Sequence, residues 1–376
     1  MKLICFENTP RHYEVIAHIA KENLGYDVTA IDYVKFLQKY FPPGIGWEDD
    51  MPLEAFFTDY TNAVMNEFQD DTIVLPLQDF TGLVWACIRE IMISRNIKNV
   101  LGPSAMGGSI ACFKPLVYEY LMSDKEKPPF EVLSLMEWMK LETKEQMDLV
   151  SKQAMEKVGS PAFIKPTAGC ASFGVGQIFS EEDITAFLTI QSELIQHNKE
   201  VIYKWKMYHM EYTIVENILK AKIDPEGKIL KHPSFLLEPF IETPLKAISE
   251  FIIWDGKVYR YALSDNVYYD DFPEIFFAVC QPTQLPTVVQ EALWEKGEKI
   301  GKAMVEKFGY NHHCFHIEWF VIPNNKHPNG FELKIMEVNS RVMSMCEPTH
   351  YRVWNKCASE VFLSLVKDKI EGKPFK

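Results

Sequence analysis

Hydrophobic and polar positions alternate along the segment Phe331–Arg341, as expected for a β-strand that is buried on one face. Successive side chains of a strand point to opposite faces. One face therefore carries three polar residues, namely Glu337, Asn339 and Arg341. The other face carries Met336 and Val338, which suit a hydrophobic core.

A second segment, His316–Phe320, alternates in the same way, so that His316 and Glu318 share a face and Ile317 points away. Two such strands side by side would gather two carboxylates, an amide oxygen and a guanidinium. Hard oxygen ligands with space left for phosphate oxygens are what a Mg²⁺–nucleotide site requires, and an arginine stabilises negative charge that carboxylates alone would repel. The alternative interpretation is a surface hairpin with its polar face in water.

In the first hundred residues, apolar strands alternate with amphipathic helices. The predicted strands are Lys2–Phe6, Asp27–Asp32, Thr72–Leu77 and Asn99–Leu101. The predicted helices are Arg11–Leu24 and Thr81–Ser94. This order predicts a parallel α/β sheet. No G-x-G-x-x-G follows the first strand, so we expect no dinucleotide in this half of the chain.

The rest of the chain mixes helices with strands that read as hairpins. A helix that starts at Ile110 is predicted to carry Lys114 and Tyr118, and further helices are predicted at Thr143–Val158, Glu181–His197 and Trp294–Phe308. Strands are predicted at Ala162–Pro166 and, joined by the turn residues Asp255-Gly256, at Ile248–Trp254 and Val258–Ser264. The aromatic and basic stretch Val201–Lys231 has no assigned role, and we expect a packed insertion there rather than a binding arm.

Composition narrows the classes of partner. The 376 residues include 39 Lys and Arg against 52 Asp and Glu, a formal net charge of −13, which argues against a nucleic-acid partner. No stretch approaches the ~20 apolar residues needed to span a bilayer, so no membrane partner is expected. The residues after Met1 do not form a signal sequence and the cysteines are scattered, which together predict a cytoplasmic protein with reduced thiols.

A lysine at the end of a strand begins the loop Lys165–Val175, whose small residues include Gly169, Ser172 and Gly174. A lysine in this position can place its ammonium on phosphate oxygens. A loop of small residues lets backbone N–H groups approach the same oxygens. This is not a Walker A loop, because the lysine precedes the glycines. A simple turn is the alternative interpretation of this stretch.

Five motifs follow one another in the chain: a helix lysine at Lys114, the strand-Lys-Pro-small loop at Lys165, Glu238-Pro239-Phe240-Ile241, His-x-Glu ending at Glu318, and Glu-x-Asn-x-Arg starting at Glu337. In this order they resemble the ATP-grasp superfamily, and more closely its carbamoyl-phosphate-synthase and biotin-carboxylase-like branch. The resemblance implies an α/β chain with α+β parts. An N-terminal parallel α/β domain would span residues 1–108, and the two subdomains of an ATP-grasp fold would span 109–238 and 239–376.

The resemblance also implies roles for individual residues. Lys114 and Lys165 would hold the nucleotide phosphates, and the loop from Gly169 through Ser172 to Gly174 would close over them. The hinge beside adenine would be Leu236–Ile241, which includes Phe240, with Glu238 and Ile241 offering backbone hydrogen bonds. The metal ligands would be Glu318, Glu337 and Asn339. Arg341 would face the transferred phosphoryl group.

The function that this resemblance implies is an ATP-dependent ligase that joins a small-molecule carboxylate to an amine through an acylphosphate. Its cofactors would be ATP and two Mg²⁺ ions, with Mn²⁺ as an alternative, and a homodimer is compatible with it. Two other functions stay open: an ATP-grasp kinase or carboxylase, and a regulatory nucleotide-binding protein without turnover. The chain departs from the branch near Lys246, where an acidic residue is usual, although Glu250 keeps the next acidic position.

Overall fold

The computed structural model describes residues 1–7, 10–42, 44, 52–168, 174–269, 272–341 and 347–373. Its contacts divide the chain into two compact units. The first comprises Met1–Tyr40, Pro52–Cys112 and Thr243–Lys376, and the second comprises Phe41–Met51 and Phe113–Glu242. The predicted division at residues 108 and 238 stays a prediction. None of the helices in the described part of the chain is long and apolar enough to cross a bilayer.

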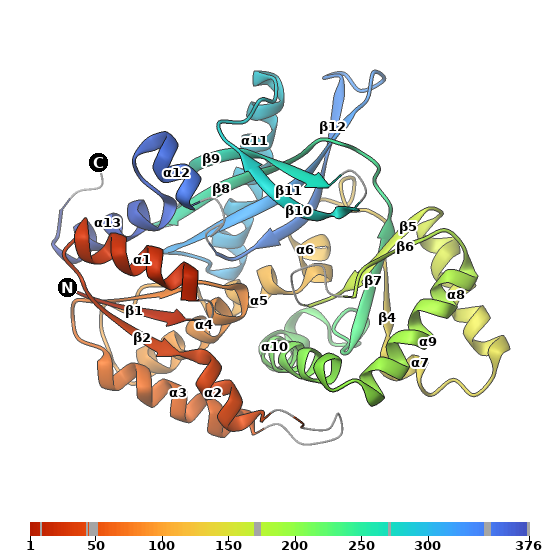
Figure 1. The fold of residues 1–376 in the computed structure, drawn as a ribbon, viewed down its shortest axis with the longest axis horizontal. Coiled ribbons are helices and arrows are strands. Elements are labelled where there is room, and N and C mark those ends of the chain that lie inside the picture. The colour runs from red at the N-terminus through yellow and green to blue at the C-terminus, as the bar shows by residue number, and fades with distance from the viewer. Residues whose placement is uncertain are drawn as a thin grey trace. The chain divides into compact units, whose positions relative to one another are not determined.

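The first unit opens with the parallel α/β arrangement that the sequence predicts (Figure 1). Its strands are β1 (Lys2–Glu7), β2 (Asp27–Asp32) and β3 (Thr72–Pro76), in the order β2-β1-β3. Its helices are α1 (Pro10–Glu22), α2 (Tyr33–Tyr40), α3 (Leu53–Glu67), α4 (Asp79–Ser94) and α5 (Ala105–Cys112). The predicted strand Asn99–Leu101 is wrong, because this segment has no regular structure. Asn99 has a φ of 60°, a left-handed conformation that an extended strand excludes.

An antiparallel sheet forms the other half of the first unit, with the order β10-β9-β8-β11-β12 in the described residues (Figure 1). The strands are β8 (Lys246–Trp254), β9 (Lys257–Tyr269), β10 (Phe272–Cys280), β11 (His313–Pro323) and β12 (Phe331–Asn339). The predicted hairpin of β8 and β9 is confirmed, since Asp255 and Gly256 turn the chain with φ angles of 47° and 75°.

Helices connect this antiparallel sheet to the rest of the first unit. The long helix α11 (Thr287–Phe308) begins seven residues before its predicted start and packs on β8 and β9. The chain closes with α12 (Glu347–Trp354) and α13 (Ala358–Ile370). A common core joins Leu3 and Leu75 of the parallel sheet to Trp254 of β8 and Phe362 of α13. Cys314 of β11, the strand that carries Glu318, belongs to the same core.

A β-bulge in β12 changes one expectation. Glu318 pairs with Glu337, but the next residue, Trp319, pairs with Ile335, so Met336 is the extra residue on β12. A bulge of this kind puts two consecutive side chains on one side of the strand. Met336 is accordingly half-exposed rather than buried in the core, and the prediction for it is wrong. Val338 is buried as predicted.

The second unit contains an antiparallel sheet of order β4-β7-β5-β6 in the described residues. Its strands are β4 (Glu131–Ser134), β5 (Ala162–Pro166), β6 (Gly176–Ile178) and β7 (Ser234–Pro239). Its helices are α6 (Lys114–Tyr120), α7 (Leu135–Trp138), α8 (Lys144–Val158), α9 (Glu181–His197) and α10 (Lys199–Ile223). The prediction of one helix that starts at Ile110 and carries Lys114 and Tyr118 is wrong, because Phe113 separates α5 from α6 in an extended conformation, with φ −113° and ψ 108°.

The stretch Val201–Lys231, whose role the sequence did not define, lies largely in α10. This helix packs on α9, and Trp205 is fully buried in the hydrophobic core of the second unit. The packed insertion that was expected is what the structure shows.

Candidate functional site

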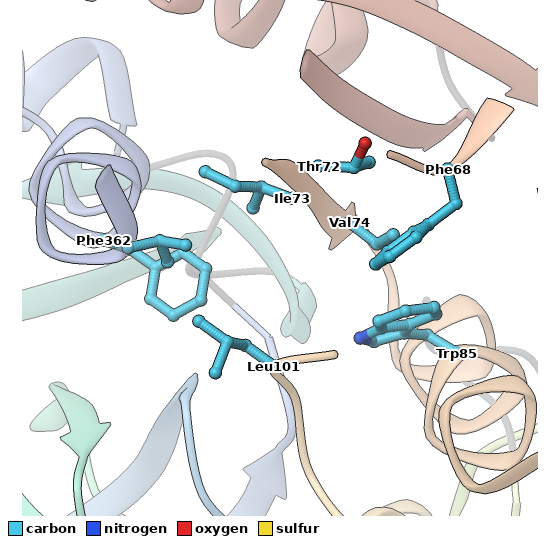
Figure 2. A pocket seen from close by; sticks show the side chains of 8 residues that line it. Phe68, Thr72, Ile73, Val74, Trp85, Leu101 and Phe362 are labelled. Atoms are coloured by element: carbon cyan, nitrogen blue, oxygen red, sulfur yellow. The ribbon is translucent and has the colours of Figure 1, made fainter. Parts of the chain in front are cut away.

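One cavity in the first unit is a packing gap rather than a binding site. It has a volume of ≈ 10 Å³, which is room for one water molecule at most. Its lining is mainly apolar and comes from β3, α4, α13 and neighbouring segments, as Figure 2 shows for Val74, Trp85 and Phe362. A site for a charged nucleotide needs convergent polar groups, which this lining lacks.

The predicted metal ligands lie together on β11 and β12. Glu318 is the register partner of Glu337, and His316 is the register partner of Asn339. Direct partners on adjacent antiparallel strands share a face of the sheet. The structure therefore brings the two carboxylates and the amide to one face, as the alternation of the sequence predicts. On the other side of His316, its partner on β8 is Glu250, which extends this polar row.

The chemistry of these ligands fits a divalent cation. Asn339 is only 4 % exposed, and its Nδ2 has no hydrogen-bond partner among the described residues. Burying a polar atom without a hydrogen-bond partner costs free energy. The oxygen and nitrogen of an Asn side chain can exchange places by rotation of the amide. The side-chain oxygen is therefore available to a ligand at this position. No cluster of three or more His, Cys, Asp or Glu side chains suited to a metal occurs in the described residues. Two carboxylates and one amide leave coordination positions for phosphate oxygens.

Two histidines fix the end of β12. His316 is fully buried, and its Nδ1 lies 3.1 Å from the backbone oxygen of Arg341. Burial and the positive charge of Arg341 lower the pKa of His316 to about 3, so the ring is neutral and its Nδ1–H donates to that oxygen. His313 holds the preceding carbonyl, with Nε2 3.0 Å from the oxygen of Ser340. His316 is thus a packed, hydrogen-bonded histidine, and it positions the backbone of Arg341.

A buried Glu–His contact beside these residues was not predicted. Glu250 is 3 % exposed, and its Oε2 lies 2.7 Å from Nε2 of the fully buried His350 on α12. The sequence offered Glu250 as an acidic position, but no local pattern ties it to a residue 100 positions away. Residue types alone also suggest Arg352 as a clamp for a substrate carboxylate and Asp270 or Asp271 as a partner for an ammonium group. Arg352 is exposed, and Asp270 and Asp271 lie outside the described residues.

The second unit holds the predicted phosphate residues. Lys165 is at the end of β5, and its Nζ lies 2.6 Å from Oε1 of Glu238 on β7, with both side chains about nine-tenths buried. Tyr118 of α6 donates a hydrogen bond of 2.5 Å to Oε2 of the same carboxylate. The sequence assigned only backbone contacts to Glu238 and gave Tyr118 no role. The spacing of Tyr118 four residues after Lys114, which places both on one helix face, was the signal that could have suggested it.

The loop after β5 is tied to its neighbours on both sides. The backbone N–H of Lys114 donates to the oxygen of Thr167 over 3.0 Å, and the N–H of Thr167 donates to the oxygen of Ser234 over 3.1 Å. Gly174 ends the loop with a φ of 64°, a conformation that favours glycine. Gly169 and Ser172 lie outside the described residues. Lys114 and Lys165 are therefore brought near each other through the fixed backbone at Thr167.

At the predicted hinge, the N–H of Phe240 donates to the oxygen of Pro161 over 2.9 Å. That N–H holds the end of β7 against the segment before β5. Ile241 follows β7 and is half-exposed. The backbone contacts predicted for Glu238 and Ile241 with adenine stay a prediction.

Many solved structures resemble the whole chain, and three of them illustrate the likeness. Biotin carboxylase from Campylobacter jejuni, in complex with β-γ-ATP, has a TM-score of 0.59 at 15 % identity, over 100 % of this chain and 72 % of the other. L-amino acid ligase from Bacillus licheniformis has a TM-score of 0.60 at 15 % identity, over 98 % and 75 %. N5-carboxyaminoimidazole synthase from Aspergillus clavatus, in complex with ADP and 5-aminoimidazole ribonucleotide, has a TM-score of 0.58 at 15 % identity, over 100 % and 77 %.

This chain has the ATP-grasp fold. The comparison confirms the predicted fold class. The sequence matches no protein-family model and no curated protein. At these identities the likeness establishes the fold, and the roles of individual residues on this ATP-grasp fold stay predictions.

Proposed function

We propose that this protein is an ATP-dependent ligase that joins a carboxylate to an amine and releases ADP and phosphate. The observation that supports this most directly is the pairing of Glu318 with Glu337 beside the buried Asn339. The solved structures of the same fold include a ligase of amino acids and complexes with ATP and ADP, which supports both the nucleotide and the reaction class.

The proposed cofactor is Mg²⁺, bound as two ions, with Mn²⁺ as an alternative. Its ligands would be Glu318, Glu337 and Asn339. A bound Mg²⁺ supplies positive charge that neutralises the phosphates of the nucleotide. The MgADP complex of the 2-oxoglutarate carboxylase domain from Hydrogenobacter thermophilus, which has the same fold, supports the choice of this ion. The buried Nδ2 of Asn339, which has no hydrogen-bond partner in the part of the chain that the structure describes, is the feature that favours a ligand at this position.

The remaining site residues bind and orient the substrates. Lys114 and Lys165 contact the phosphates, and the hinge Leu236–Ile241, including Phe240, lies along adenine. The loop that contains Gly169, Ser172 and Gly174 covers the phosphates and keeps water out. Arg341 lies beside the transferred phosphoryl group, with its backbone held by His316. An arginine here stabilises negative charge as it develops on the reacting oxygens.

The reaction needs activation, because a free carboxylate is a poor electrophile whose leaving group would be oxide. A carboxylate oxygen attacks the γ-phosphorus of ATP, ADP leaves, and an acylphosphate forms. The amine then attacks the acyl carbon, loses a proton, and phosphate leaves. Water would hydrolyse the acylphosphate, so the site must exclude it.

Carboxylation is the second candidate. In this reaction bicarbonate takes the place of the organic carboxylate and is activated in the same way. The Hydrogenobacter structure contains bicarbonate together with MgADP, which is the observation that favours this alternative. Both reactions release ADP and phosphate, and they differ in the acid that the enzyme consumes.

The deciding experiment measures phosphate release with pooled small carboxylic acids, amino acids and amines, with and without bicarbonate. The ligase requires both a carboxylate and an amine, and mass spectrometry should find a product whose mass is that of the two substrates minus water. Dependence on bicarbonate would favour the carboxylase. Phosphate retained on an organic product would favour a kinase, and release of AMP and pyrophosphate would contradict all three.

The partners of this enzyme would be small molecules, in a cytoplasmic setting. The Hydrogenobacter domain with the same fold is a dimer, and we propose a homodimer for this chain as well. Light scattering of the purified protein would test the dimer directly.

A further inference from the structure

Three side chains of the second unit form a chain of contacts around one carboxylate. Tyr118 is 2 % exposed and its hydroxyl donates to Oε2 of Glu238 over 2.5 Å. The other oxygen, Oε1, lies 2.6 Å from Nζ of Lys165. The carboxylate of Glu238 therefore bridges a phenol and an ammonium, and it is itself only 7 % exposed.

The pairing of β5 with β7 does not by itself fix the position of the Lys165 side chain relative to that of Glu238. Lys165 pairs with Leu236, and Glu238 pairs with Phe163, so the two side chains are diagonal neighbours on one face. Diagonal positions are about 7–8 Å apart, a distance that only long side chains span. Both side chains have several rotatable bonds, so their ion pair can adopt more than one geometry unless a third group restricts it.

Tyr118 is suited to restrict it. A tyrosine has only two side-chain torsions, and the ring of Tyr118 is held against that of Phe130, with centroids 5.7 Å apart. The helix that carries it begins at Lys114, whose backbone N–H is bonded to Thr167 of the loop after β5. The hydroxyl is thus fixed relative to β5, on which Lys165 lies.

We propose that Tyr118 is a positioning residue for nucleotide phosphate: it fixes the Glu238 carboxylate, which in turn holds the Lys165 ammonium where phosphate binds. This inference rests on the proposed function, because it assigns a phosphate to Lys165. A positioning role and a packing role predict different results. If Tyr118 positions Lys165, loss of the hydroxyl weakens the binding of ligands that carry phosphates and leaves the binding of the nucleoside unchanged.

The test is calorimetric titration of the full chain with a non-hydrolysable ATP analogue plus Mg²⁺, and separately with adenosine. Tyr118→Phe should weaken binding of the analogue about tenfold, the loss typical of one hydrogen bond to a charged group, and should leave adenosine affinity unchanged. Tyr120→Phe, the same change two residues later on α6, should leave both affinities unchanged. Thermal unfolding of each variant checks that the fold is kept.

The variant Glu238→Gln tests the same positioning role by changing the carboxylate instead of the phenol. This change keeps an oxygen for Tyr118 but removes the charge that holds Lys165, so it should also weaken the analogue selectively. Adding Tyr118→Phe to it should then cause no further loss, because the two residues act in series. Equal weakening of analogue and adenosine, no weakening, or fully multiplicative losses in the double variant would each overturn the inference. If the unmodified protein binds neither ligand, the proposed function fails with it.

Discussion

Glu318 on β11 stands directly opposite Glu337 on β12, with His316 opposite Asn339 at the next position on the same face. Like charges in direct cross-strand positions destabilise a sheet. A hairpin selected only for stability would place a lysine at one of these two positions. Further along β12, Glu332 has Ile322 as its cross-strand partner and forms an ion pair of 2.7 Å with Lys334 of its own strand. The opposed carboxylates are the arrangement that the proposed cation site requires.

Glu337→Gln tests this explanation. It should abolish Mg²⁺-dependent ATP consumption, because an amide is a weaker ligand and carries no charge. In metal-free buffer the free energy of unfolding should stay equal or rise by about 0.2–1 kcal/mol, because one of two opposed charges is removed. Phosphate release and urea unfolding measure the two effects.

The matched control for that prediction is Glu332→Gln on the same strand. Its register partner is Ile322, five positions from the paired carboxylates, so turnover should be unaffected. Near-normal turnover of Glu337→Gln with Mg²⁺, or loss of turnover in both variants, would contradict the metal site.

The sequence predicted the shared face of Glu318, Glu337 and Asn339 because strand periodicity is a local property of the backbone. It did not predict the bulge at Met336, since an inserted residue shows itself only in the pairing with β11. Periodicity also failed at Asn99, where a short apolar run looks like a strand but a positive φ prevents one.

Contacts between segments that are distant along the chain could not be predicted from the sequence, for a different reason. The pair Glu250 and His350 comes from β8 and α12, and the link from Tyr118 to Glu238 comes from α6 and β7. Such contacts depend on how elements pack, and the residue types involved also occur in many solvated positions. The order of motifs along the chain was informative at the level of fold, whereas the positioning of each side chain required the structure.

Lys165→Ala should weaken binding of Mg²⁺–ATP and also destabilise the protein. The change leaves the Glu238 carboxylate buried without its cation, and breaking a buried ion pair in this way typically costs ~3–5 kcal/mol. The remaining hydrogen bond from Tyr118 places the expected loss at the lower end of this range. Calorimetry measures the first effect and urea unfolding the second.

Lys157→Ala is the control in the same unit. Lys157 pairs with Glu131 over 2.6 Å, but their side chains are 55 % and 33 % exposed. Exposed pairs contribute at most ~1 kcal/mol, so stability should change little and ATP affinity not at all. Unchanged ATP affinity in Lys165→Ala would remove its assigned phosphate role.

Gly297→Ala should destabilise the first unit by ~1–3 kcal/mol, the usual cost of overpacking a core. A Cβ at Gly297 of α11 would lie 2.2 Å from the ring of Phe251, which stacks on Phe315 of β11 with centroids 4.9 Å apart. The ring cannot move without disturbing the strand that carries Glu318. Lys302→Ala, on the exposed side of the same helix, should change stability by less than about 0.5 kcal/mol in the same urea titration.

The stability of the second unit should fall at acidic pH because of His209. Burial, and then the positive charge of Lys206, lower the pKa of His209 from 6.5 to about 4. Between these two values the unfolded state binds a proton that the native state does not, so stability is lost as the pH falls from 6.5 toward 4 and is fully present above 6.5. His209→Gln should make the free energy of unfolding less dependent on pH across this window, as measured by urea titrations at pH 7.5, 6 and 5. The dependence should not vanish, because burial also lowers the pKa of His232. A slope in His209→Gln equal to that of the unmodified protein would show that this imidazole is not kept neutral by the fold.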